Sequence, residues 1–320
     1  MLYQTIQLRE HHRMQNRVQS RPLASASSRG QGRSGEKQGQ RLLIAGGLIL
    51  GTVGVFAEEA NQPALVTVWF RCVFGALALL VWGLATGRVA ELRIRGRSWW
   101  IVLAAGGFMV LNWALFFAAI PLTSIGVATI VFHIQPVWLI FYSAVVLHEA
   151  VPRRQQVATA VALGGLVLTT GLWSGSVNDI KSGHDYVVGL LLCLGGSLSY
   201  AAVTILAKRE KVVTSFAMAW WQCAVGILVL AWTPITYGWP TQVSSWAWLA
   251  GLGVLHTGLA YAILFAGMTC MTLGRVAVLQ YVYPLTAVLL DWVVYGRTLD
   301  AVQLTGVGLM GIALVAIKSR

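Results

Sequence analysis

Ten apolar runs, each about as long as a bilayer-crossing helix, follow one another along this chain from Arg41 onward. They fall at 42–58, 64–86, 99–119, 122–147, 156–173, 187–207, 213–234, 245–267, 272–295 and 301–317. A hydrocarbon core about 30 Å thick needs roughly 20 apolar residues in a helix, and neighbouring helices help the shorter runs to cross. Only 11% of the residues are charged, against about a quarter in soluble domains. The sequence predicts an all-α integral membrane protein of ten transmembrane helices.

The formal net charge of +12 lies in loops and in the N-terminal tail. Positively charged loops stay in the cytoplasm, and with the tail inside, the outer loops keep only Lys181 and Arg297. The cytoplasmic segments then hold Arg88, Arg93, Arg95, Arg97, Arg153, Arg154, Lys208, Arg209, Lys211, Lys318 and Arg320. We therefore expect a multi-pass protein of the inner (plasma) membrane with both termini cytoplasmic, and no nucleic-acid partner.

Residues 1–38 are rich in Arg, Gln, Ser and Gly and contain no apolar run. Such a segment cannot bury enough surface to offset the entropy of ordering, so we predict a disordered, basic cytoplasmic tail. Its composition also resembles a transit peptide, against which Glu10 and Glu36 argue. A third interpretation places the true start at Met14.

An internal repeat connects the two halves of the chain. At a constant offset, Trp113 aligns with Tyr261, Gly126 with Gly274, Pro136 with Pro284, and His133 with Tyr281. The third to fifth spans thus resemble the eighth to tenth. Because each half has five spans, an odd number, the second half is expected to be inverted relative to the first, as in many transporters. The predicted repeats cover 41–173 and 187–318.

Several motifs resemble those of the EamA-type drug/metabolite transporter superfamily. In the first half they are Arg71, the stretch Thr123-Ser124-Ile125-Gly126-Val127-Ala128, Pro136, His148-Glu149, and Gln155 to Gly171 with Gly164 and Gly165. The second half repeats the pattern with Gly274, Pro284, Tyr295-Gly296, Gln303 and Gly311. Arg297 departs from it, since the family usually has Glu there, which puts a matched acidic pair in doubt.

The resemblance implies a basket of ten helices around a central cavity and the export of small metabolites. The aromatic central helices are most similar to YddG-type exporters of aromatic and other amino acids. The resemblance therefore predicts a secondary transporter of small amphipathic solutes, most of all amino acids. Another metabolite or drug of the same superfamily is the alternative. A monomer is expected, since two inverted halves already enclose a cavity.

A transporter's binding site should lie near the midplane, where polar groups are costly and seldom without a role. Counting inward from the helix ends and using the family positions gives candidate substrate-binding residues. They are Asn112, Trp113, Phe116, His133, Trp138, Tyr200, His256, Tyr261, Gln280 and Tyr281. Aromatic rings among them would contact an amphipathic solute, although ordinary packing explains many such residues equally well.

Two prolines, Pro136 and Pro284, fall inside the fourth and ninth spans. A proline removes a backbone donor and frees a carbonyl about one turn earlier, so each helix can kink there. A hinge and an ordinary membrane-helix proline are equally good interpretations of these positions.

Arg71 lies about two turns inside the outer boundary, too deep to remain without a partner. Glu58, Glu59 and Asp291 lie at similar depth. A structural ion pair with Glu59 or Asp291 is the leading interpretation, and attraction of a substrate carboxylate is the alternative.

His133 and His256 could relay protons, because imidazole titrates near physiological pH, but a neutral hydrogen-bonded histidine is more common. Facilitated diffusion competes with proton coupling, since no acidic residue is evident at the midplane. The cysteines have no paired spacing, so no metal or cofactor is expected. An intramembrane enzyme would need clustered carboxylates or a nucleophile motif such as GxSxG, and neither occurs. A channel would need a repeated ring of pore-lining polar residues, and the sequence shows none.

Overall fold

The computed structural model describes residues 35–123, 125–170, 184–296 and 299–316, and every regular element in these ranges is a helix. A helix over 35–51 continues, after a turn at Thr52, as α2 (Val53–Ala60). The elements that follow are α3 (Ala64–Ala85), η1 (Val89–Leu92), α4 (Arg97–Ala119), η2 (Ile120–Leu122), α5 (Ile125–Phe132), α6 (Gln135–Val145), α7 (Arg153–Thr169), α8 (His184–Arg209), α9 (Ser215–Val229), α10 (Thr233–Tyr237), α11 (Val243–Gly251), η3 (Leu252–Leu259), α12 (Ala260–Thr269), α13 (Leu273–Leu279), α14 (Val282–Tyr295) and α15 (Ala301–Ala316).

Seven helical stretches in the described residues are long and apolar enough to cross a membrane. They are Gly35–Ala60, Ala64–Ala85, Arg97–Phe116, Val127–Val145, His184–Arg209, Val243–Thr269 and Leu273–Tyr295. Three further predicted spans correspond to α7, α9 and α15, which have 17, 15 and 16 residues. At about 1.5 Å per residue these helices are shorter than the roughly 30 Å of a hydrocarbon core. Seven spans are thus supported by length, and the count of ten stays a prediction.

The first helix begins inside the segment predicted to be a disordered tail. That prediction is wrong for residues 35–38, which are helical; residues 1–34 lie outside the described residues. Glu36 forms an ion pair with Arg275, and a Cβ atom built on Gly39 would lie 3.0 Å from the carbonyl oxygen of Gly267. Contacts with a distant segment, which composition does not reveal, extend the helix beyond its apolar run.

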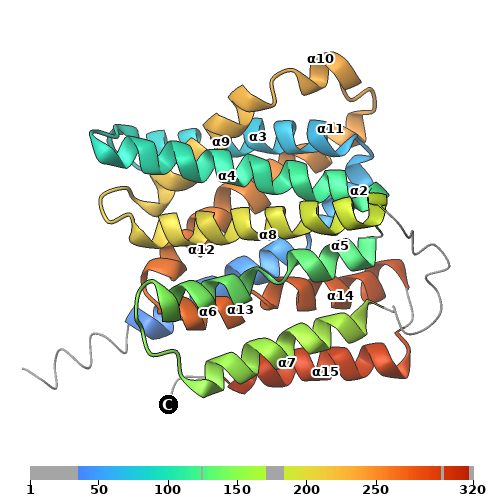
Figure 1. Ribbon diagram of the computed structural model, residues 1–320. Coiled ribbons are helices and arrows are strands. Elements are labelled where there is room, and N and C mark those ends of the chain that lie inside the picture. Colours follow the sequence, from blue (N-terminus) through green and yellow to red (C-terminus); the bar gives the residue numbers. More distant parts are fainter. Residues whose placement is uncertain (1–34, 124, 171–183, 297–298, 317–320) are drawn as a thin grey trace, which may run out of the picture.

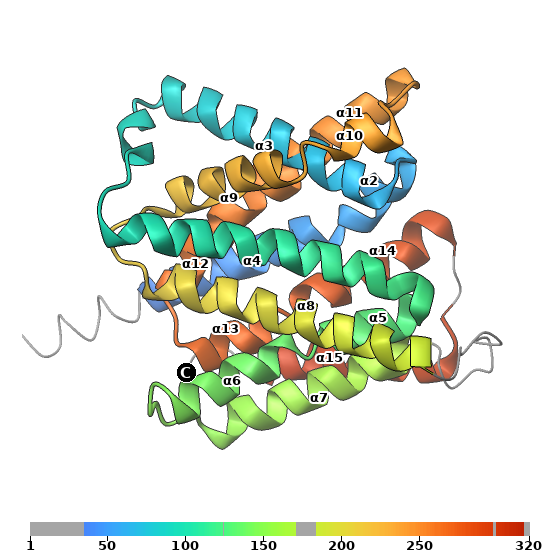
Figure 2. The same ribbon diagram turned by 45° about the horizontal axis from the view of Figure 1, so that its top comes forward.

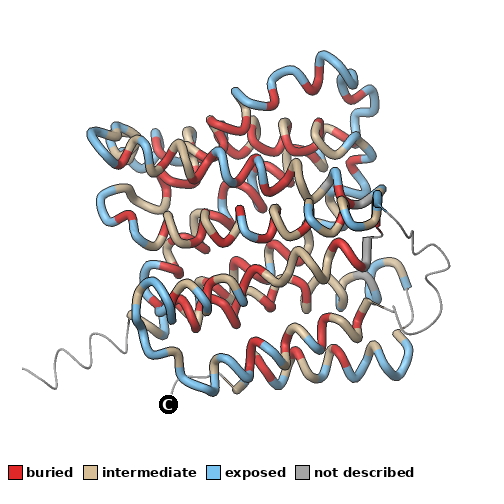
Figure 3. Tube along the Cα trace, in the orientation of Figure 1, coloured by how far each residue is buried: buried red, intermediate tan, exposed pale blue. Residues whose placement is uncertain are grey.

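Large apolar side chains face outward along the helices, which supports a bilayer as the surrounding solvent. Leu191, Leu228 and Ile312 are among them, at 61%, 77% and 64% exposure. Figure 3 shows buried residues on the inward faces and exposed ones on the outer helices and at the loops. A soluble monomer rarely exposes apolar patches of this extent.

The helices lie roughly side by side, in an arrangement that brings distant segments of the sequence together (Figure 1). α4 runs beside α8, α7 beside α15, and α6 beside α13, in both views (Figure 2). α3 packs against both η3 and α9. The α3–α4, α6–α7 and α8–α9 loops lie at the same end of the molecule as the start of the first helix (Figure 1). The basic residues of these loops therefore gather at one end.

The α7–α15 contact is set by two glycines that meet backbone to backbone. A Cβ on Gly165 would lie 2.7 Å from the carbonyl oxygen of Gly306, and one on Gly306 would lie 2.5 Å from that of Gly165. Gly164 and Gly308 have no such neighbour within 4 Å. Close approach at small residues is how helices pack where no water drives them together.

Candidate functional site

The fourth and ninth apolar runs of the sequence, 122–147 and 272–295, were expected to form continuous or kinked helices around their prolines. In the structure each run is broken into two helices. The first break lies at residues 133 and 134, between α5 and α6, and the second at residues 280 and 281, between α13 and α14. Pro136 is the second residue of α6, and Pro284 the third residue of α14. A proline in the first turn has no N–H to donate to the preceding segment. The breaks thus lie where proline chemistry predicts, although hinge motion at them stays a prediction.

The two breaks are joined by a hydrogen bond from one to the other. After the first break, the Val137 N–H donates to the Ile134 carbonyl at 2.8 Å, as in a tightened turn. The Tyr281 hydroxyl, on a residue with 0% exposure, donates to the His133 carbonyl at 3.1 Å. A buried carbonyl in a bilayer needs such a partner. The Tyr281 hydroxyl therefore supplies a hydrogen bond to the His133 carbonyl, which the break leaves without a helical partner.

Two pairs of predicted repeat partners are in contact. His133 and Tyr281 form one pair, joined by a hydrogen bond, and in the other the Trp113 side chain lies beside the Tyr261 hydroxyl. A residue can touch its equivalent under a two-fold rotation only when both lie close to the rotation axis. If the halves are inverted repeats, these contacts mark the axis, where transporters of this architecture bind their solutes.

Beside the breaks, two glutamine side chains converge on one threonine. Gln135 and Gln280 each place an amide nitrogen near the Thr204 hydroxyl, at 3.4 and 3.5 Å. Two buried atoms here have no hydrogen-bond partner in the described part of the chain, namely Oε1 of Gln280 and Nε2 of His133. The other ring nitrogen of His133 lies 2.7 Å from the Thr129 carbonyl. Buried polar atoms without partners are rare, so these two atoms keep unused hydrogen-bonding capacity beside the breaks.

Arg71, on α3, is held against a π-helical segment of the eighth span. Its Nε donates to the Thr257 hydroxyl at 2.8 Å, and its guanidinium carbon lies 5.0 Å from the centre of the Trp113 ring. Thr257 belongs to η3, a wider helical turn of the kind often found at functional sites. No ion pair joins Arg71 to Glu59, which is exposed. The Asp291 side chain lies outside the described residues.

His256 belongs to the same π-helix but contacts a different neighbour. Its Nε2 lies 2.6 Å from the Thr52 hydroxyl, at the turn that interrupts the first helix. Its ring packs edge-on against Phe56, with centres 4.7 Å apart. His256 is fully buried and does not contact His133. A proton relay would have to connect two separate places in the bundle.

The remaining predicted residues join α4 and α6 to α8. Asn112 donates to the Gly196 carbonyl at 2.9 Å, and the Trp138 indole donates to the Ser197 hydroxyl at 3.2 Å. The rings of Phe116 and Tyr200 both face Phe132, with centres 4.7 and 6.3 Å away. These contacts give Asn112 and Trp138 packing roles between helices, beside any contact with a solute.

Sequence reasoning missed five polar residues that contact the predicted ones: Thr52, Ser197, Thr204, Thr257 and Tyr283. The ring of Tyr283 lies 5.5 Å from that of His133. The threonines went unnoticed because their hydroxyls can bond to their own helix, so a threonine in an apolar run carries little signal. Tyr283 could have been predicted, since it is adjacent to Pro284, which marks the break in the ninth span.

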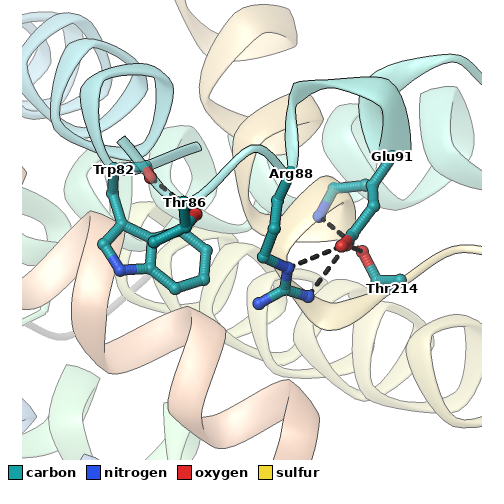
Figure 4. Close-up of polar contacts among 6 residues, drawn as sticks. Trp82, Thr86, Arg88, Glu91 and Thr214 are labelled. Carbon is teal, nitrogen blue, oxygen red and sulfur yellow. Dashed lines mark hydrogen bonds and ion pairs between the residues drawn. The ribbon is translucent and has the colours of Figure 1, made fainter. Parts of the chain in front are cut away.

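At the basic end of the bundle, a cluster of polar contacts joins the α3–α4 loop to the start of α9 (Figure 4). Arg88 donates to both carboxylate oxygens of Glu91, at 2.5 and 2.8 Å, and the Thr214 hydroxyl donates to Glu91 at 2.6 Å. Thr214 also caps α9 by accepting from the Ala217 N–H. Arg88 lies over the Trp82 ring. We call Arg88, Glu91 and Thr214 the loop cluster.

The loop cluster predicts a pH-dependent contribution to stability. The hydrogen bonds that Glu91 accepts from Arg88 and Thr214 lower its pKa below the ordinary value of 4.5, although burial acts in the opposite direction. A carboxylate whose pKa is lower in the folded protein stabilises above its unfolded pKa, and the benefit is lost as pH falls through the folded pKa. We expect Glu91→Gln to lower the melting temperature of the purified protein at pH 7, and the difference from wild type to shrink as the pH falls below 4.5 and through the lowered pKa of Glu91.

The control for this experiment is Glu59→Gln, which removes the same charge from an exposed side chain. We expect its melting temperature at pH 7 to equal that of the wild type. Equal melting temperatures for Glu91→Gln and wild type at pH 7 would show that the loop cluster does not contribute to stability.

Comparison with known proteins identifies the family. The chain is 25% identical over 278 residues to the transporter YxxF of Bacillus subtilis (strain 168), covering 85% of this chain and 88% of that protein. It is 28% identical over 285 residues to a transporter of Archaeoglobus fulgidus, covering 89% and 97%. The pseudopaline exporter CntI of Pseudomonas aeruginosa (strain PAO1) is 24% identical over 287 residues, covering 88% and 96%.

A solved crystal structure shares the fold, with a TM-score of 0.78 at 19% identity, over 88% of this chain and 96% of that one. The sequence profile of the EamA-like transporter family matches twice, at residues 37–171 and at 187–318. Together these two matches cover most of the chain, and the protein therefore belongs to the EamA-like transporter family.

Proposed function

We propose that this chain is a secondary transporter that exports small amphipathic metabolites, including aromatic and other amino acids, by alternating access around a midplane site. In this proposal ten helices form two inverted repeats, at 41–173 and 187–318, and the protein acts as a monomer in the plasma membrane with cytoplasmic termini. The double match of the family profile, at nearly the same two ranges, supports the repeats. A relative named as an exporter supports the direction of transport.

The observation that carries the proposal is the contact of repeat partners, which lie at the broken helices for His133 and Tyr281 and on α4 and α12 for Trp113 and Tyr261. Trp113 with Tyr261, and His133 with Tyr281, bring polar groups and aromatic rings to one central place. Discontinuous helices expose backbone and side-chain polar groups there, which is how transporters build sites inside the bilayer. Rings with a polar edge suit a solute that has both an apolar and a polar part.

The test is uptake by proteoliposomes that contain the purified protein. Radiolabelled phenylalanine, tryptophan, leucine, threonine and glutamate are offered separately, with and without a pH gradient. We expect uptake above that of protein-free vesicles, with the aromatic amino acids fastest. Stimulation by the gradient would indicate proton coupling, and equal uptake without it would indicate facilitated diffusion.

Two variants distinguish uptake through the proposed site from passive leakage across the vesicle membrane. Trp113→Ala removes a ring from the centre and is expected to abolish most uptake at equal protein density. Trp100→Ala makes the same chemical change at a residue that is 72% exposed, and its uptake should match that of the wild type. If no amino acid enters any vesicle faster than the protein-free control, amino acids are not the substrates.

A further inference from the structure

The guanidinium of Arg71 is held in place, but only one of its N–H groups donates a hydrogen bond within the described chain. Arg71 is 9% exposed, and its Nε donates to Thr257. Within the described residues, no hydrogen bond or ion pair reaches its two terminal nitrogens. A guanidinium has five N–H donors in a planar fork. Four of them, on the outer edge of the group, therefore have no partner from the described chain.

Two contacts fix the direction in which this outer edge points. The Thr257 hydroxyl donates to the Leu252 carbonyl at 3.1 Å, which uses its only proton and leaves a lone pair for Arg71. The Trp113 ring lies 5.0 Å from the guanidinium carbon, within the range of a cation–π contact. Because Thr257 and Trp113 hold the group from two helices, little entropy is lost when a ligand binds it.

The surroundings of Arg71 are aromatic and neutral. Its charge acts on the side chains of Tyr200, Tyr261 and Tyr283, and the hydroxyls of Tyr200 and Tyr283 make no hydrogen bond to another described residue. A charge inside the membrane region is costly unless a counter-ion lies beside it. No acidic side chain of the described chain supplies one, so the guanidinium can accept a carboxylate from a ligand.

We propose that Arg71 binds the carboxylate of the transported solute through its two terminal nitrogens, while the neighbouring rings contact the apolar part. This rests on the proposed transport function and narrows the substrates to amphipathic solutes that carry a carboxylate. A planar fork fits a carboxylate with two parallel hydrogen bonds. Since the described cluster contains no carboxylate to bind an ammonium group, the α-amino group of an amino acid adds little to affinity.

Three probes of one shape separate these contributions: phenylalanine, 3-phenylpropionate, which lacks the amino group, and phenylalaninamide, which lacks the carboxylate. Their binding to the purified protein in detergent is followed by tryptophan fluorescence, to which Trp113 contributes. We expect phenylalanine and 3-phenylpropionate to bind within threefold of each other, and phenylalaninamide at least tenfold more weakly.

Variants of Arg71 test whether it is the source of this preference. Arg71→Gln should bind 3-phenylpropionate and phenylalaninamide within twofold of each other, and Arg71→Lys should keep a reduced preference for the acid. Arg95→Gln, which removes an exposed positive charge, should bind like the wild type. If Arg71→Gln does not fold, Arg71→Lys and the wild-type series remain decisive.

Three results would overturn the inference: equal binding of acid and amide by the wild type, a preference for the acid that persists in Arg71→Gln, or no binding of any probe. Binding is measured without transport, so the two proposals fail separately. Amino acid uptake without any preference for the acid would refute the role of Arg71 and leave the transport function standing.

Discussion

Replacing Gly165 with leucine is expected to prevent the protein from accumulating in folded form. The new Cβ would lie 2.7 Å from the Gly306 carbonyl oxygen and 3.0 Å from the Met310 backbone nitrogen. Both are backbone atoms, so relief requires α7 and α15 to move apart. Overpacking a well-packed site costs about 1–3 kcal/mol, and a clash with backbone lies at the upper end. The measurement is the yield of monodisperse protein after extraction, together with its melting temperature.

The neighbouring glycine provides a matched control for this change. Gly164 is exposed and has no atom within 4 Å of a built Cβ, so Gly164→Leu makes the same substitution one residue away. A second pair exists on α15, where Gly306→Leu should fail and Gly308→Leu should be tolerated. Normal yields for Gly165→Leu and Gly306→Leu would show that α7 and α15 are not packed as described.

The succession of helices could be predicted from the sequence because each span is a local property. Apolar runs near 20 residues long leave the chain one way to satisfy its backbone in a bilayer. The interior of the spans was less predictable. Composition does not distinguish an α-helix from the π-helical stretch Leu252–Leu259, since both present apolar side chains. The early start of the first helix depends on Arg275, about 240 residues away.

The candidate site was predictable to the extent that the repeat was visible. Trp113 with Tyr261 and His133 with Tyr281 were aligned by sequence alone, and both pairs are in contact. The partner of Arg71 was not predictable. An acidic residue was expected beside it, whereas a threonine and an indole ring contact it. Sequence patterns favour charge pairing, but in a bundle the contacts of a long side chain depend on which helices cross nearby.

The loop cluster connects the two proposed halves at the end of the molecule where the basic loops gather. Glu91 follows α3, Thr214 precedes α9, and the Thr214 hydroxyl donates to the Glu91 carboxylate at 2.6 Å. Alternating access requires the two halves to separate at each end in turn. If the loop cluster closes the cytoplasmic end, a covalent bridge across it should hold that end closed.

We therefore expect a Glu91→Cys/Thr214→Cys protein, bridged by a short bis-methanethiosulfonate, to lose transport down to the level of protein-free vesicles. Dithiothreitol should restore it. Cys270 is the one exposed cysteine among the four, so the experiment uses a Cys270→Ser background. Uptake of the best substrate from the amino acid panel is the measurement, before and after reduction of the same vesicles.

A bridge within one loop shows whether the linker itself is harmful. Val89→Cys/Arg93→Cys places both thiols in the α3–α4 loop, so its bridge leaves the two halves free to separate and transport should continue. Loss of transport only in the 91–214 pair, recovered by reduction, would mean that these loops part during each cycle. Unchanged transport by the bridged 91–214 protein would mean that this end opens elsewhere, and that the loop cluster serves stability alone.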